Sequence, residues 1–100
     1  MLTFPLKKQW YEKIKSGEKT IEYREVKPYW TTRFYNEFGF FPEQMPKGWK
    51  MEIPCYLRLG YTKEYMRATI VNVEVIDGKD TDLAIDKPVY AIHLADVKEN

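Results

Sequence analysis

The chain has 100 residues, of which 31% are charged and 16% are aromatic, and its formal net charge is +1. This length fits a single domain, residues 1–100, and is too short for a TIM barrel or a complete dinucleotide-binding domain. The chain has one cysteine, Cys55, and one histidine, His93. These numbers exclude an intrachain disulfide, a cysteine-based zinc site and a multi-histidine metal site, and we expect no cofactor.

The location of the protein is predicted from its uncharged segments and its cysteine content. The longest uncharged run, Pro88–Ala95, has eight residues and is too short to cross a bilayer. The first residues lack the basic and apolar segments of a signal peptide. We therefore expect a cytoplasmic protein without a membrane partner, present as a monomer or a homodimer.

Charge is unevenly distributed along the chain. Residues 1–70 carry thirteen Lys and Arg against eight Asp and Glu, whereas residues 71–100 carry three against seven. This asymmetry indicates either an ordinary solvated surface or a modest positive face for a phosphate-bearing partner such as RNA.

The first element predicted in the chain is a helix over about residues 5–16. Three apolar residues share one helical face through their spacing of four: Leu6, Trp10 and Ile14. Pro5 suits the first turn of a helix, and Gly17 suits the left-handed position just after its end.

The rest of the chain is dominated by alternating apolar and polar residues. These patterns predict four strands: Thr20–Val26, Ile53–Leu59, Met66–Ile76 and Val89–Val97. A short second helix over Tyr29–Phe38 ends at Gly39, residues 39–50 form a loop, and residues 80–87 form a loop or helical turn. We expect an α+β fold, a small and mostly antiparallel β-barrel with one or two packed helices.

The segment around residues 17–24 contains the main candidate site. In a strand, Thr20, Glu22 and Arg24 lie on one face, while apolar Ile21 and Tyr23 lie on the other and should face the core. The corner before the strand carries Lys19, which lets an ammonium, a carboxylate and a guanidinium surround one small polar ligand. The alternative is an exposed, salt-bridged strand that contributes little.

The same segment resembles a known family. Four residues match the G-x-K-x-x-E-x-R signature of ASCH domains, which belong to the PUA-like superfamily: Gly17, Lys19, Glu22 and Arg24. The predicted order of elements around the motif is also similar. The resemblance implies a PUA-like β-barrel with a cleft beside the motif that binds RNA or a modified nucleoside.

One branch of the family is similar to amidohydrolases that deacylate N4-acylated cytidine with a Lys, a Thr and a Glu. The Lys matches Lys19, but the Thr falls at Glu22 and the Glu falls at Val71. Thr20 and Glu74 lie near these positions, although Glu74 would need a bulge to reach the same face. Other members resemble ribonucleases or RNA-binding modules.

Each residue of the motif has a candidate role. We expect a charged Lys19 to polarise a carbonyl or phosphate oxygen and Glu22 to activate water or accept hydrogen bonds. Arg24 would orient Glu22 or contact phosphate. Thr20 and Arg67, which alternates with Met66 and Ala68, are further candidate binding residues.

Aromatic residues cluster after the motif, where Tyr29 and Trp30 begin a run that extends to Phe41. These side chains either pack a helix onto the barrel or stack on unpaired bases. The functional alternatives are therefore an enzyme, acting by amide deacylation or RNA cleavage, and a non-enzymatic RNA-binding reader. Cys55 is expected to be a buried, inert thiol, and His93 to lie on a barrel face.

Overall fold

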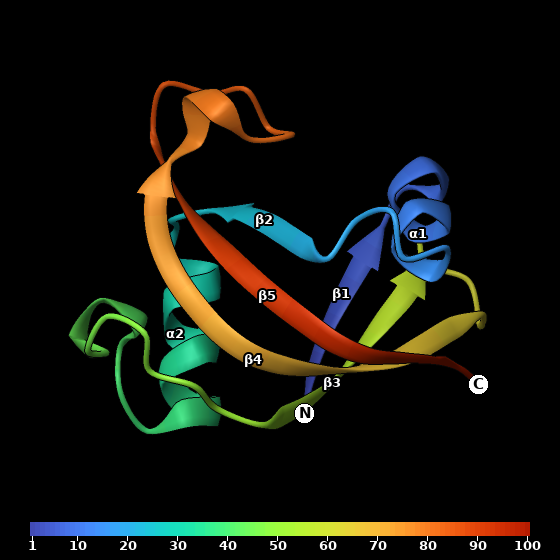
Figure 1. Ribbon diagram of the computed structural model, residues 1–100, viewed down its shortest axis with the longest axis horizontal. Helices are drawn as coiled ribbons and strands as arrows, with labels where there is room; N and C mark the ends of the chain where they lie inside the picture. Colours follow the sequence, from blue (N-terminus) through green and yellow to red (C-terminus); the bar gives the residue numbers. More distant parts are fainter.

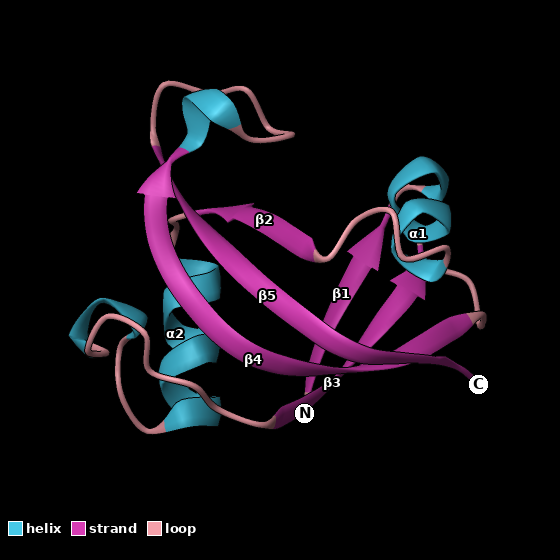
Figure 2. Cartoon of the chain, in the orientation of Figure 1, coloured by secondary structure: helices cyan, strands magenta, loops and turns pink.

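The computed structural model describes all residues, 1–100, and consists of one curled sheet with two α-helices (Figure 2). The strands are β1 (Leu2–Leu6), β2 (Ile21–Glu25), β3 (Ile53–Leu59), β4 (Tyr65–Asp77) and β5 (Pro88–Glu99). The helices are α1 (Lys8–Lys15) and α2 (Pro28–Phe38), with short 3-10 helices η1 (Pro42–Gln44) and η2 (Gly78–Asp80). No helix combines the length and the apolar composition needed to cross a membrane.

The sheet has the strand order β1-β3-β4-β5-β2. β1 runs parallel to β3, and the other three pairings are antiparallel. Register shifts interrupt the pairing of β4 with β5 between Arg67 and Thr69 and between Ile70 and Asn72. Bulges of this kind bend a strand, and the long β4 and β5 curl so that the sheet forms a half-barrel (Figure 1). The prediction of a small, barrel-like α+β fold is confirmed at this level.

The beginning of the chain differs from the prediction. Residues 2–6 form a strand, and helix α1 starts only at Lys8. Leu2, Phe4 and Leu6 are all buried while the residues between them are half-buried, which is the period-two pattern of a strand. Pro5 therefore lies in an edge strand, where a missing N–H is tolerated, and not in a helix. The helix over residues 5–16 was wrong in its first turn because Leu6 fits both periodicities.

Helix α2 follows the prediction closely. It begins at Pro28 and ends at Gly39, whose φ of 84° is the left-handed conformation that glycine adopts without strain. The helix lies beside the curled strand β4 (Figure 1). Its buried Trp30 and Phe34 belong to the core, where Phe34 meets the ring of Tyr90 edge-on at 4.8 Å. Much of the aromatic run thus closes one side of the half-barrel.

The core lies on the concave face of the sheet. A cluster of 16 buried residues fills it, including Leu57 of β3, Ile70 of β4 and Ile92 of β5. Cys55 belongs to this cluster, as predicted, and burial raises the pKa of its thiol to about 12, so it is unreactive at neutral pH.

Candidate functional site

The charged face of β2 points inward. Glu22 pairs with Ile92 and Arg24 pairs with Tyr90, and both partners belong to the core face of β5. Glu22 is 6% exposed and is the only buried charged residue of the protein. The expectation that Ile21 and Tyr23 face the core was wrong, since both are only half-buried. The reason is that β2 is a free edge of the half-barrel, and its inner face borders a cavity instead of packed side chains.

Arg24 fixes the Glu22 carboxylate from one side. Its Nε and Nη2 donate to Glu22 Oε2 at 3.0 and 2.8 Å, and Nη2 also donates to the carbonyl oxygen of Pro5 at 2.7 Å. The guanidinium lies 5.1 Å from the ring of Trp30 and 5.6 Å from that of Phe4. Arg24 therefore links β2 to β1 across the open side of the barrel and leaves Nη1 without a partner in the chain.

Lys19 approaches Glu22 from the other side. The chain turns at Gly17, with a φ of 84°, and the Lys19 N–H donates to Lys13 O at 3.0 Å, which sets the corner between α1 and β2. Lys19 Nζ forms an ion pair with Asp82 and lies 3.9 Å from Glu22 Oε1. Two aromatic rings flank this ammonium, Tyr23 at 4.7 Å and Trp10 at 5.3 Å.

The protonation of Glu22 is governed mainly by its burial. Desolvation raises the pKa of this carboxyl above its ordinary 4.5, and the nearby charges of Arg24 and Lys19 oppose this effect only in part. Glu22 Oε2 takes both bonds from Arg24, whereas Oε1 takes none from Arg24 and lies 3.9 Å from Lys19 Nζ. A carboxylate of this kind is a stronger base than an exposed one and has one oxygen available.

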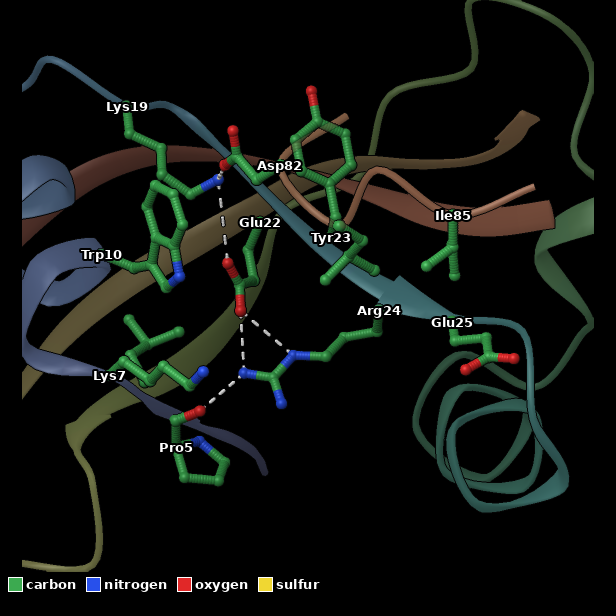
Figure 3. Close-up of a pocket in the computed structure, with 12 residues that line it drawn as sticks. Pro5, Lys7, Trp10, Lys19, Glu22, Tyr23, Arg24, Glu25, Asp82 and Ile85 are labelled. Atoms are coloured by element: carbon green, nitrogen blue, oxygen red, sulfur yellow. Dashed lines mark hydrogen bonds and ion pairs between the residues drawn. The ribbon is translucent and has the colours of Figure 1, made fainter. Parts of the chain in front are cut away.

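These side chains line a cavity of about 350 Å³ (Figure 3). Its walls come from β1, α1, the corner before β2, β2 itself and the loop after η2. Twelve residues line it: Pro5, Leu6, Lys7, Trp10, Lys19, Glu22, Tyr23, Arg24, Glu25, Asp82, Leu83 and Ile85. The volume lies within the range of small-molecule sites, and apolar walls with a few convergent polar groups are typical of them.

The structure brings together three of the predicted site residues, Lys19, Glu22 and Arg24, and leaves the other four outside the cavity lining. Thr20 is exposed and lines a shallower hollow behind Lys19. Trp30 places its ring 5.1 Å from the Arg24 guanidinium, outside the cavity lining. Tyr29 is exposed and stacks on Arg33 at 3.4 Å. Arg67 is exposed on β4, beside the ring of Tyr56.

Sequence reasoning missed five polar or aromatic members of the site: Lys7, Trp10, Tyr23, Glu25 and Asp82. Trp10 was placed on the apolar face of a helix with Leu6 and Ile14, and it is only half-buried and forms a wall of the cavity. Asp82 lies 63 residues from Lys19 in sequence, within a segment whose composition indicated only a loop. No local pattern distinguishes it from the other acidic residues of that segment.

The remaining candidates form a separate pair on the outer face of the sheet. His93 Nε2 lies 2.8 Å from Glu74 Oε1, and neither residue lines the cavity. Glu74 therefore does not supply an acid to the site, and no bulge turns it inward, because the register shifts fall before Asn72. Val71 is likewise absent from the cavity lining.

Comparison with known proteins gives no relative. No family model, no curated protein and no solved structure matches the chain.

Proposed function

We propose that the cavity binds a modified nucleoside and hydrolyses an acyl amide on its exocyclic nitrogen, as an ASCH-type, PUA-like domain would. The proposal combines the G-x-K-x-x-E-x-R motif with the geometry around its charged residues. N4-acylated cytidine is the substrate class of the amidohydrolase branch that the motif resembles, and the placement of Lys19 and Glu22 is compatible with hydrolysis of its amide. The absence of a cysteine pair and the single buried thiol fit a cytoplasmic setting for such an enzyme.

One observation carries the proposal: a buried carboxylate and a lysine ammonium face the same cavity, 3.9 Å apart. Amide hydrolysis needs a base for the attacking water and a positive donor for the oxygen that becomes negatively charged. Glu22 Oε1 and Lys19 Nζ supply these two functions from adjacent positions. The rings of Trp10 and Tyr23 offer faces on which a planar base stacks.

The reaction would proceed in two steps. Glu22 takes a proton from water while the hydroxide adds to the acyl carbon, and Lys19 donates a hydrogen bond to the developing oxyanion. Glu22 then gives its proton to the exocyclic nitrogen as the carbon–nitrogen bond breaks, which releases a carboxylic acid and the free amine. The raised pKa of Glu22 makes the carboxylate a stronger base for the first transfer, and the carboxyl group formed in that step is the acid for the second.

Arg24 would act by holding Glu22 and not by touching the reacting atoms. Its two bonds to Oε2 fix the carboxylate so that Oε1 remains directed into the cavity. This division leaves Lys19 and Glu22 as the catalytic residues and Arg24 as a positioning residue.

The test is hydrolysis of N4-acetylcytidine by the wild-type protein and by two variants. Glu22→Gln should lower kcat by about 10²–10⁴-fold, the range expected for loss of a general base. Lys19→Met should lower kcat by about 10²–10³-fold, as for loss of an oxyanion donor. Lys47→Met and Glu52→Gln, two exposed positions away from the cavity, are the matched controls and should retain wild-type rates. Equal rates in all five proteins would refute the proposal.

A second function, an RNA-binding reader, is favoured by the surface of α1. Lys7, Lys8 and Lys13 are exposed beside the cavity, and none of them forms an ion pair. A reader would bind RNA more tightly as the strand lengthens and would lose affinity steeply with salt. A nucleoside hydrolase would turn over the free nucleoside at a rate nearly independent of salt, so the two functions are separated by these measurements.

A further inference from the structure

Asp82 lies on a loop whose base is firmly anchored. The Gly78 N–H donates to Lys87 O at 2.9 Å, and the Ile85 N–H donates to Gly78 O at 3.2 Å. A Cβ at Gly78 would lie only 2.7 Å from Lys87 O, so the two ends of the loop are in tight contact. The loop therefore projects from a fixed base above β2 (Figure 1), and its Asp82 carboxylate meets the Lys19 ammonium over the cavity (Figure 3).

The two ends of the cavity differ in their charge. At one end, Lys19 faces two carboxylates, Asp82 in direct contact and Glu22 at 3.9 Å. At the other end, Arg24 Nη1 has no partner and Lys7 forms no ion pair, while Glu25 is paired with lysines outside the lining, at 3.3 and 3.5 Å. The Arg24 end therefore offers an anion the unpaired Nη1 of the guanidinium and the ammonium of Lys7, whereas the Lys19 ammonium is already paired with Asp82.

The geometry points to Asp82 as a specificity-determining residue that admits an uncharged carbonyl group at Lys19 and excludes a phosphate. This inference rests on the proposed function, and it specifies that the bond hydrolysed at Lys19 is an amide and not a phosphodiester. A neutral carbonyl oxygen needs one N–H of Lys19, and the ammonium has three, so Asp82 can keep its bond. A phosphate placed there would lie beside the carboxylates of Asp82 and Glu22, while the charges of Lys19 and Arg24 are already paired with them, so the like charges would repel.

The experiment uses inorganic phosphate as the probe and follows the amide and indole N–H resonances of the protein by NMR. In the wild type, phosphate should leave the Lys19 amide and the Trp10 indole unchanged, whatever it does near Lys7. In Asp82→Asn, both resonances should shift and saturate, with a phosphate affinity at Lys19 raised at least about tenfold by removal of one nearby negative charge. Asp82→Glu, which keeps the charge, is the matched control and should behave as the wild type.

Two results would overturn the inference: phosphate binding at Lys19 in the wild type, or no gain in a folded Asp82→Asn protein. Circular dichroism establishes folding, and Asp82→Ser serves as a second charge-removing variant. Loss of the fold in both variants would assign Asp82 to stability and would also overturn the inference.

Failure of the proposed function is distinguishable from failure of this inference. If no protein binds or hydrolyses N4-acetylcytidine but Asp82→Asn still gains phosphate at Lys19, the exclusion of anions by Asp82 stands and the nucleoside proposal fails. If the wild type hydrolyses the nucleoside and Asp82→Asn gains no phosphate, the proposed function stands without this role for Asp82.

Discussion

Two pairs of polar side chains lie on opposite faces of the same sheet, and they differ sharply in their surroundings. Inside the half-barrel, Glu22 and Arg24 are joined by two hydrogen bonds, and the Glu22 side chain is 8% exposed. Outside, Glu74 and His93 share one contact of 2.8 Å, and the Glu74 side chain is 50% exposed. Each pair joins a glutamate to a nitrogen-bearing side chain, but only the inner pair is removed from water. Burial therefore decides which pair affects stability and protonation.

The largest expected effect comes from breaking the inner pair. Arg24→Met leaves the Glu22 carboxylate buried without its partner, so we expect the free energy of unfolding to fall by about 3 kcal/mol. Urea denaturation followed by tryptophan fluorescence measures the change. Arg58→Met, at an exposed position of β3, is the matched control and should change stability by less than about 0.5 kcal/mol. A loss for Arg24→Met as small as that of the control would mean that the inner pair behaves like a surface pair.

Removal of both charges should have a smaller effect than removal of one. In the double variant Glu22→Met with Arg24→Met, no unpaired charge remains in the core, and stability should return to within about 1 kcal/mol of the wild type. Hydrolysis of N4-acetylcytidine should nevertheless be abolished. A double variant as unstable as Arg24→Met alone would show that packing by the guanidinium, and not the unpaired carboxylate, causes the loss.

The third effect is a change in the pH dependence of stability. The pKa of Glu22 is raised in the folded state, so above its ordinary value of 4.5 the folded protein holds a proton that the unfolded chain has lost. Stability of the wild type should therefore fall with rising pH between 4.5 and the raised pKa, by about 1.4 kcal/mol for each unit of the shift. In Glu22→Gln this component disappears. Parallel pH profiles for the two proteins would contradict the raised pKa.

The smallest effect is expected on the outer face. Glu74→Ala removes the partner of His93, but both side chains are partly solvated, so we expect a loss of less than about 0.5 kcal/mol. The rate of nucleoside hydrolysis should remain that of the wild type, because neither residue lines the cavity. A drop in that rate would connect the outer face to the site and remove the contrast between the two pairs.

Local sequence signals predicted most of the elements. Gly39 marked the end of α2, and alternation marked β3, β4 and β5, because these signals depend on a few adjacent residues. The strand β1 was missed since Leu6 fits a helical stripe as well as a strand. Its parallel pairing with β3 joins residues about fifty positions apart, which no short pattern encodes.

The site residues that lie close together in the sequence were predicted, and those contributed by distant segments were missed. Lys19, Glu22 and Arg24 lie within six residues, so the geometry of one corner and one strand was enough to group them. The direction of the strand face could not be derived, because apolar Ile21 and Tyr23 normally mark the core side. At the open edge of the half-barrel, the charged face of β2 points inward and the face with the apolar residues does not. The position of this edge, like that of Asp82, depends on tertiary structure and is not encoded in a local pattern.

The bond from Arg24 to the Pro5 carbonyl oxygen also bears on the pairing of sheet edges between copies of the protein. β1 and β2 are the terminal strands of the sheet, and terminal strands invite intermolecular pairing. Pro5 has no backbone N–H to donate to an incoming strand, and its carbonyl oxygen already accepts a bond from Arg24. Neither backbone group of this residue is therefore free to pair with another chain. The contact that orients the carboxylate thus also removes one residue of the β1 edge from pairing with another chain.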